Sequence, residues 1–273
     1  MGSGPAGFDP ALLHRYGSAM LDYELRGHVA LLTINRPEAR NAVNGDVSAG
    51  IEAGIDALEE DEDAWVGVLT GAGPVFSAGA DLKAIASGDA AGLQTERGGF
   101  AGIVQRDRTK PIIAAVDGPA LAGGTEIVLS CDLVVASNEA RFGIPEVKRS
   151  LVAAGGGLFR LPRKLPFSIA LELALTGDPI SAERAYHFGM VNELCEPGQA
   201  VEAAMALAER ICVNAPLAVR ESRRLMLEST EITDDDEGIR RSNQALAGLF
   251  GTDDFAEGPT AFIEKREPRW TGH

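Results

Sequence analysis

The sequence has 273 residues, of which 45% are hydrophobic and 24% charged, as is typical of a soluble globular protein with one large domain, or one domain and a smaller appendage. Its formal net charge of −15 argues against general binding to nucleic acid or to anionic membranes. No apolar run reaches the roughly 18–20 residues that a membrane span requires, and no secretory signal pattern opens the chain.

The first part of the chain predicts an extension, a hairpin and a helix. Residues 1–19 are rich in Gly, Pro and Ala and have no periodic pattern, which predicts a flexible extension. Two β-rich runs flank the turn signal Arg26-Gly27 and predict a hairpin over residues 21–34. Apolar residues at helical spacing then predict a helix through residues 47–58, ended by the acidic run at 59–63.

Buried strands alternate with helices further along the chain, and this alternation is typical of an α/β fold. We expect strands at residues 65–70, 112–116 and 133–136. Residues 88–102 contain few large apolar side chains, so we expect a mobile segment there. From residue 167 onward helices dominate. The expected helices span residues 169–175, 182–188, 200–213, 217–227 and 253–265.

Residues 118–146 combine a glycine pair with two carboxylates. Gly123 and Gly124 precede an apolar segment that predicts a helix, and a helix start offers free backbone N–H groups. Glycine lets a ligand approach those groups closely. Glu126 lies in the first turns of that helix, and Glu146 follows twenty residues later, after a strand and a turn. Two carboxylates beside a backbone oxyanion site would form an acid/base centre.

These residues, with Phe76-Ser77-Ala78-Gly79-Ala80-Asp81-Leu82-Lys83 upstream, resemble the crotonase (enoyl-CoA hydratase/isomerase) superfamily. The resemblance runs from about residue 21 to residue 272. It implies an α/β spiral of ββα units over residues 20–205. It also implies a C-terminal helical region over residues 206–273 that packs into homotrimers or dimers of trimers.

In the resembled family, two backbone N–H groups bind the thioester oxygen of an acyl-CoA substrate. The resemblance assigns these groups to Ala80, in the run Ala78-Gly79-Ala80-Asp81, and to Gly123. On residue type alone both segments would be ordinary tight turns. Their order and spacing favour the functional interpretation.

Glu126 and Glu146 resemble the carboxylate pair of the hydratases in this family. Such a pair can hold one water molecule: one carboxylate takes its proton as it adds to the β-carbon, and the other manages the proton at the α-carbon. Each glutamate alone would more often be a solvated side chain. Together they predict an enoyl-CoA hydratase of fatty-acid metabolism (β-oxidation), which converts a trans-2-enoyl-CoA into a 3-hydroxyacyl-CoA without a metal or a redox cofactor.

The resemblance also implies contacts with coenzyme A, which enters as part of the substrate. One group of contacts, with the nucleotide end of coenzyme A, would come from Ala78, Asp81, Leu82 and Lys83. Lys83 would pair with a phosphate, although a solvated helix lysine is an equal alternative. Phe262 and Lys265 resemble a C-terminal segment that contacts the coenzyme, and that can reach the ligand of a neighbouring subunit. Helix packing is the alternative role for Phe262.

The exact reaction stays open on the sequence. Residues 153–157 are glycine-rich but lack the Lys-Ser/Thr ending of a P-loop, and residues 158–163 resemble several crotonase branches, including carnitinyl-CoA dehydratase-like ones. An enoyl-CoA isomerase, which can work with one carboxylate, and a carnitinyl-CoA dehydratase-like enzyme are therefore the nearest alternatives. A non-catalytic acyl-CoA-binding protein is the alternative from another class.

The cysteines and histidines predict a reduced protein without a metal centre. Cys131, Cys195 and Cys212 include no close pair, which favours a cytoplasmic location over a disulfide framework. The four histidines are scattered and do not form a zinc-binding pattern.

Overall fold

The computed structural model describes residues 20–273, so the extension predicted for residues 1–19 lies outside the described residues. β1 (Leu21–Arg26) and β2 (Val29–Ile34) form the predicted hairpin. Gly27 in its turn has a φ of 59°, a left-handed conformation that glycine adopts without strain.

Within the described residues the main sheet has six strands in the order β1-β2-β3-β6-β8-β11. β1 pairs antiparallel with β2 at the edge, and the other neighbouring strands are parallel. The three buried strands predicted from the sequence are confirmed as β3 (Val66–Gly71), β6 (Ile112–Val116) and β8 (Leu133–Ser137). β11 (Glu193–Cys195) adds a further parallel strand that was not predicted.

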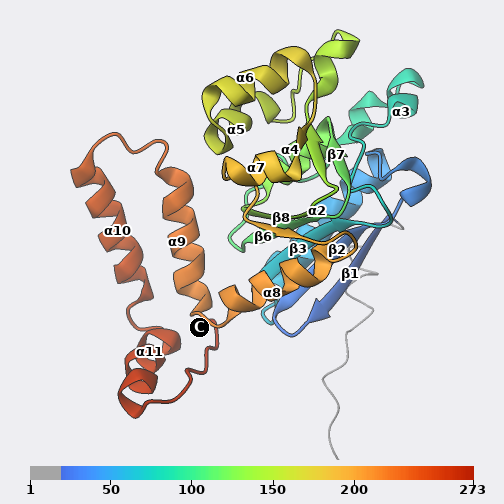
Figure 1. The fold of residues 1–273 in the computed structure, drawn as a ribbon. Coiled ribbons are helices and arrows are strands. Elements are labelled where there is room, and N and C mark those ends of the chain that lie inside the picture. Colours follow the sequence, from blue (N-terminus) through green and yellow to red (C-terminus); the bar gives the residue numbers. More distant parts are fainter. Residues whose placement is uncertain (1–19) are drawn as a thin grey trace, which may run out of the picture.

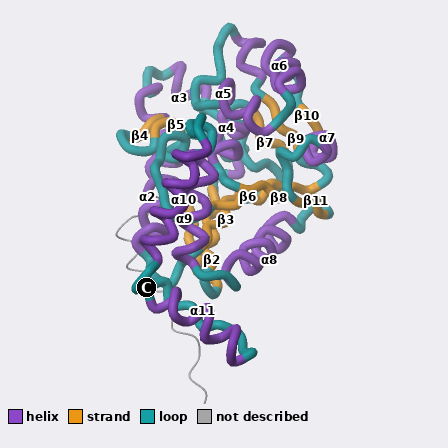
Figure 2. The backbone as a smooth tube through the Cα atoms, turned by 90° about the vertical axis from the view of Figure 1, so that its left-hand side faces the viewer, coloured by secondary structure: helices purple, strands orange, loops and turns teal. Residues whose placement is uncertain are grey.

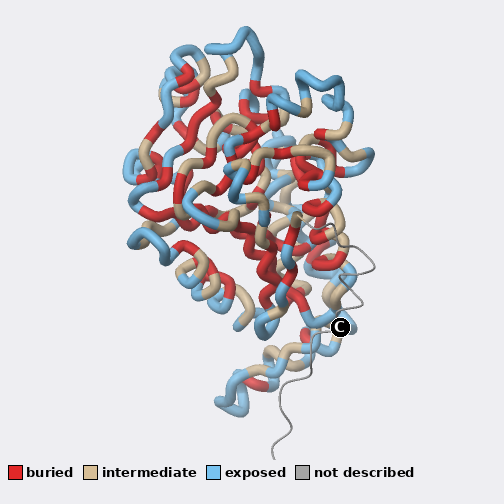
Figure 3. Tube along the Cα trace, turned by 90° about the vertical axis from the view of Figure 1, so that its right-hand side faces the viewer, coloured by how far each residue is buried: buried red, intermediate tan, exposed pale blue. Residues whose placement is uncertain are grey.

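Helices cover both faces of this sheet, which explains why its central strands are apolar on both sides (Figure 1). α2 (Gly45–Glu60) packs on one face, where Ile55 and Leu32 belong to one core cluster. α8 (Ala200–Cys212) packs on the other face, where the next strand position, Leu31, belongs to a second cluster. Figure 3 shows buried residues concentrated along these central strands.

A smaller sheet positions the glycine pair. Its strand order is β10 (Ile180–Ser181), β9 (Arg141–Gly143), β7 (Pro119–Leu121). β7 leads directly into α4 (Gly123–Ser130), the helix predicted after the glycine pair.

The other elements are short or lie toward the C-terminus. They are η1 (Pro37–Ala39), α3 (Leu82–Ala86), η2 (Ala90–Leu93), β4 (Gln94–Thr95), β5 (Gly99–Phe100), η3 (Pro145–Arg149), α5 (Gly157–Lys164), α6 (Phe167–Thr176), α7 (Ala182–His187), α9 (Pro216–Glu228), α10 (Asp235–Leu249) and α11 (Asp253–Glu264). The helices α6 to α9 and α11 confirm the helical second half. No helix among residues 20–273 is both long enough and apolar enough to cross a bilayer.

α9, α10 and α11 project from the α/β body as an arm (Figure 1), and Figure 2 shows α11 extending below the body. The expected boundary at residue 206 falls inside α8, and the arm begins with α9. Its exposed apolar side chains include Met226, Ile239, Phe250 and Phe262. Arg223 on α9 ties the arm to the body, because its Nε lies 2.9 Å from Asp132 Oδ1.

Candidate active site

Most of the predicted site residues line one cavity of about 900 Å³. The cavity lies between α3, the start of α4, η3 and the segment that follows η2. The predicted residues in its lining are Ala78, Ala80, Asp81, Leu82, Lys83, Gly123, Glu126 and Glu146. Three segments that are distant in the sequence therefore meet at one place.

The Ala80 N–H is left out of the bridge that holds its segment. Val43 pairs with Ala80 in an isolated parallel bridge. The two bonds of this bridge run from Val43 N to Gly79 O and from Asp81 N to Val43 O, each 2.8 Å long. They fix the peptide on both sides of Ala80 and do not use its own N–H. That N–H is therefore available to a ligand in the cavity.

Gly123 offers a second backbone N–H, because it is the first residue of α4 and has no intrahelical acceptor. Ala122 before it has a φ of 51° and a ψ of −126°, a strained conformation for a residue with a side chain. Gly79 approaches Gly123 closely, because a Cβ on Gly79 would lie 2.6 Å from the Gly123 nitrogen. The lack of side chains therefore brings the two predicted oxyanion segments together.

Glu126 is buried on α4, with 4% of its surface exposed. Its Oε1 accepts a hydrogen bond from the Gly157 N–H at 2.9 Å. Burial raises the pKa of Glu126 to about 7, and the charge of Glu146 adds to this effect. The N–H groups of Gly157 and Gly155, and the charge of Arg160, oppose the rise. Glu126 is therefore suited to proton transfer near neutral pH.

Glu146 is half-buried near the start of η3, directly after Pro145. Its Oε2 is buried, and no donor among residues 20–273 reaches it. Burial also raises the pKa of this carboxyl. A buried acceptor without a partner in a cavity is where a bound water or substrate would be expected to donate.

Asp81 has a structural role that the sequence did not reveal. Its Oδ1 accepts from the Lys83 N–H at 2.9 Å and caps α3, while its Oδ2 lies 2.7 Å from Arg36 Nη1. The hydrogen bond from Arg36 lowers the pKa of Asp81. Asp81 thus holds the start of α3 beside the cavity and leaves the Lys83 side chain exposed at its rim.

Other cavity residues were missing from the sequence prediction. Arg40, Lys148 and Arg149 add positive charge to the lining, which favours an anionic ligand although the chain has a net charge of −15. Lys148 is also paired with Asp178 at 2.6 Å. Phe100 approaches Gly123 so closely that a Cβ on Gly123 would clash with its ring. Basic residues are common on protein surfaces, so the sequence alone does not identify Arg40, Lys148 and Arg149 as cavity residues. Only their position in the fold does.

Phe262 and Lys265 lie at the end of α11 in the arm, and neither lines the cavity. Phe262 is 85% exposed. Their contact with coenzyme A stays a prediction, and within one subunit nothing brings them to the site.

The segment expected to be mobile is anchored to α2. Arg97 Nη2 lies 2.5 Å from Asp56 Oδ2, and Arg106 pairs with the other oxygen of Asp56. Gly98 N donates to Glu52 Oε2 at 2.8 Å. These bonds hold the cavity wall that contains Phe100. The mobility of residues 88–102 stays a prediction.

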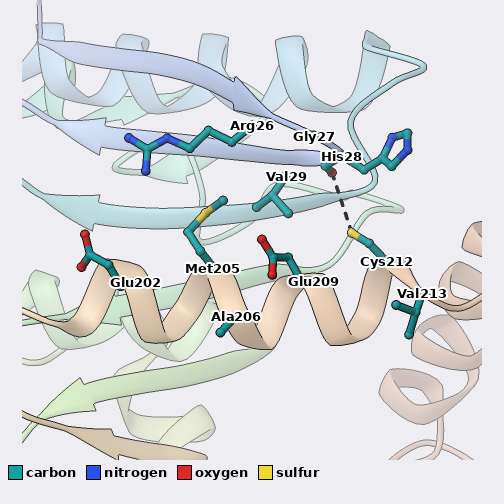
Figure 4. Close-up of a pocket in the computed structure, with 10 residues that line it drawn as sticks. All are labelled: Arg26, Gly27, His28, Val29, Glu202, Met205, Ala206, Glu209, Cys212 and Val213. Atoms are coloured by element: carbon teal, nitrogen blue, oxygen red, sulfur yellow. Dashed lines mark hydrogen bonds between the residues drawn. The ribbon is translucent and has the colours of Figure 1, made fainter. Parts of the chain in front are cut away.

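A second cavity, of about 680 Å³, lies between the β1–β2 turn and α8 (Figure 4). Met205 and Val29 contribute its apolar lining, and Cys212 Sγ lies 4.0 Å from the His28 carbonyl oxygen. Its carboxylates, Glu202 and Glu209, are exposed on α8. No group of three potential metal ligands occurs within residues 20–273. The lining of this second cavity contains no buried carboxylate like Glu126.

Comparison with known proteins agrees with this geometry. A family model described as Enoyl-CoA hydratase/isomerase matches residues 24–273. The enoyl-CoA hydratase EchA19 of Mycobacterium tuberculosis is 41% identical over 253 residues, covering 90% of this chain and 94% of that protein. A carnitinyl-CoA dehydratase of Salmonella arizonae is 37% identical over 253 residues, covering 90% of this chain and 96% of that one. The crystal structure of an enoyl-CoA hydratase from Mycobacterium tuberculosis superposes with a TM-score of 0.89 at 50% identity, covering 93% and 99% of the two chains.

Proposed function

Because the chain belongs to the enoyl-CoA hydratase/isomerase family, we propose that it is an enoyl-CoA hydratase. It adds water reversibly across the 2,3 double bond of a trans-2-enoyl-CoA and gives a 3-hydroxyacyl-CoA. The observation that carries this proposal is the presence of two carboxylates, Glu126 and Glu146, in one cavity with the backbone N–H groups of Ala80 and Gly123.

In this proposal the two backbone N–H groups stabilise the enolate. They donate to the thioester oxygen, which gains negative charge when water attacks the β-carbon. Both donors are held by the fold before substrate binds, so they need little reorganisation during the reaction. Loss of one such donor typically costs about 3 kcal/mol in the activation free energy. Because backbone dipoles meet this charge, the scheme needs no metal and no redox cofactor.

The two glutamates transfer the protons. One carboxylate accepts a proton from the bound water while the water oxygen forms a bond to the β-carbon. The other carboxyl delivers a proton to the α-carbon as the enolate collapses. The net change is addition of H and OH across the double bond. The pKa of Glu126, about 7, lets the pair hold a proton near neutral pH, and burial raises the pKa of Glu146 as well.

The alternatives differ in the acyl group or in the number of carboxylates needed. A carnitinyl-CoA dehydratase-like activity is the second candidate, because one relative at 37% identity has that name. Dehydration of a 3-hydroxyacyl-CoA is the same reaction run backwards, so the same residues would serve. An isomerase can work with one carboxylate, and a silent binder needs neither. The presence of both carboxylates therefore favours the hydratase over the isomerase and over the silent binder.

We also propose that the protein works as a homotrimer or a dimer of trimers in the cytoplasm, within fatty-acid β-oxidation. The exposed apolar side chains of the arm support an assembly, because a monomer would leave them in water. In such an assembly Phe262 and Lys265 would contact the coenzyme of a neighbouring subunit. Light scattering at micromolar concentration tests this: a stable species of the 28.6 kDa chain mass would contradict it.

A direct assay tests the hydratase. Incubation with crotonyl-CoA should give a product heavier by one water molecule in mass spectrometry. A panel of enoyl-CoAs of different length and branching then identifies the preferred acyl group. Binding of acyl-CoA without any gain of water would favour the non-catalytic alternative.

A further inference from the structure

Arg160 on α5 lies against the glycine loop 155–157 and bonds two parts of the cavity wall. Its Nη1 donates to Gly155 O at 3.1 Å, and its Nη2 donates to Val104 O at 2.5 Å. Gly156 has a φ of 105°, and a Cβ there would clash with Arg160 Nη1. The guanidinium is therefore in direct contact with the backbone of this loop.

The same loop also contacts Glu126 of α4. Gly157 N donates to Glu126 Oε1 at 2.9 Å, and a Cβ on Gly155 would lie 2.6 Å from Glu126 Oε2. The loop thus contacts the carboxylate of Glu126 as well as the guanidinium of Arg160. A displacement of the Gly155 carbonyl would move the N–H groups that Glu126 uses.

The charge of Arg160 has no ion-pair partner among residues 20–273. Within these residues its two hydrogen bonds end on neutral carbonyl oxygens, and no carboxylate lies within ion-pair distance of it. Partial burial weakens the screening of this charge by water. Among the charged groups around Arg160, Glu126 has the strongest electrostatic interaction with it. The arginine charge therefore favours ionised Glu126.

We propose that Arg160 is a positioning residue of the active site, which fixes the loop that holds Glu126 and keeps that carboxylate available in its ionised form. The bond to Val104 O also joins this loop, through Arg160, to the segment after β5 that lines the same cavity. The link to catalysis depends on the hydratase function proposed above, whereas the link to the ionisation of Glu126 does not.

The test compares Arg160→Gln with wild type in two measurements. Infrared difference spectra titrate the carboxyl band that disappears in Glu126→Gln, and steady-state kinetics follow the hydration of crotonyl-CoA. We expect the midpoint of Glu126 ionisation to rise by about one pH unit in Arg160→Gln, because an attractive charge is lost. We expect kcat to fall by roughly ten- to a hundredfold with KM nearly unchanged, because small displacements at a reacting group are costly.

Arg163→Gln is the matched control. Arg163 is on the same helix, and its guanidinium lies over the same Phe159 ring. Its Cζ is 5.4 Å from the ring centroid, against 4.9 Å for the Cζ of Arg160. Arg163 is exposed, and the hydrogen bonds to Gly155 and Val104 come from Arg160 and not from Arg163, so its replacement should change neither measurement. Arg160→Lys keeps the charge but cannot reach both carbonyls, so it should keep the wild-type midpoint and lose about tenfold in kcat.

A folded Arg160→Gln in which Glu126 ionises at the wild-type pH would overturn the proposal. If Arg160→Gln does not fold, Arg160→Lys decides the matter, and wild-type kcat in that variant would overturn the positioning role. Failure of the hydratase proposal looks different: wild type would not hydrate crotonyl-CoA, yet the midpoint of Glu126 would still shift in Arg160→Gln.

Discussion

The amide nitrogen of Gly157 lies 2.9 Å from Glu126 Oε1, so the first residue of α5 holds a carboxylate that belongs to α4. This hydrogen bond favours the ionised form, whereas burial favours the protonated form and raises the pKa to about 7. Burial is the larger effect. Glu126 can therefore accept and release a proton near neutral pH.

The raised pKa of Glu126 makes stability depend on pH. Its folded-state pKa of about 7 exceeds the ordinary value of 4.5, so the folded state binds this proton more tightly than the unfolded state. The resulting stabilisation is complete below pH 4.5 and is lost as the pH rises through about 7. We expect Glu126→Gln, which cannot ionise, to exceed wild type in the free energy of unfolding by up to about 3 kcal/mol at pH 8, and by much less at pH 5.

Urea denaturation of both proteins at the two pH values measures this difference. Glu139→Gln, at an exposed position, is the control and should change the free energy of unfolding little at either pH. An equal effect of Glu126→Gln at pH 5 and pH 8 would contradict the raised pKa.

Gly79→Ala should disrupt the contact between the two oxyanion segments. Gly79 has a φ of 84°, and its new Cβ would lie 2.6 Å from the Gly123 nitrogen. We expect kcat for hydration to fall by on the order of a hundredfold, as for loss of one oxyanion donor. Gly88→Ala is the control, since Gly88 has a φ of 89° with open space around it. Similar losses of kcat in both variants would mean that backbone strain alone is responsible.

Local patterns predicted much of this fold and site. The hairpin, the buried strands and most helices follow from apolar runs bounded by turn residues, which neighbouring positions reveal. The ordered glycine and glutamate segments predicted one cavity, because their order matches a known family. α10 was missed, since charged residues and Gly238 weaken its apolar pattern.

Contacts between distant residues could not be predicted in this way. Arg160 and Val104 are 56 positions apart, and Arg36 and Asp81 are 45 positions apart. The segment expected to be mobile contains Arg97, whose partner Asp56 lies 41 positions earlier on α2. A polar side chain looks the same in a sequence whether it is solvated or bonded across the fold. Only the structure distinguishes the two.

The arm should depend on Asp132 for its attachment. Asp132 pairs with Arg223 of the arm at 2.9 Å and with the buried Arg108 at 2.6 Å. Asp132→Ala leaves Arg108 buried without its counter-charge, so we expect the free energy of unfolding to fall by about 3–5 kcal/mol. Asp178→Ala breaks the exposed pair with Lys148 and should cost about 0–1 kcal/mol. Urea denaturation measures both, and equal losses would refute this role of Asp132.

Lys83 should contribute to coenzyme binding through its charge. It lies exposed at the rim of the cavity, so its attraction to a phosphate is screened by salt. Lys83→Ala should weaken acyl-CoA binding more at low salt than at high salt in calorimetric titrations. Lys265→Ala should behave in the same way only if the arm reaches a neighbouring site. Arg210→Ala, which changes an exposed arginine outside the cavity lining, is the control. Wild-type affinity of Lys83→Ala at low salt would remove Lys83 from the site.

The turnover of crotonyl-CoA by glutamate variants tests the central claim most directly. Glu126→Gln and Glu146→Gln keep the shape of each side chain but remove its titrating group. We expect each change to lower kcat by on the order of 10²–10⁴ while acyl-CoA affinity stays nearly intact. The double variant should be only slightly worse than the worse single one, because both groups act on one water molecule. Hydration at wild-type rates by both single variants would contradict the mechanism.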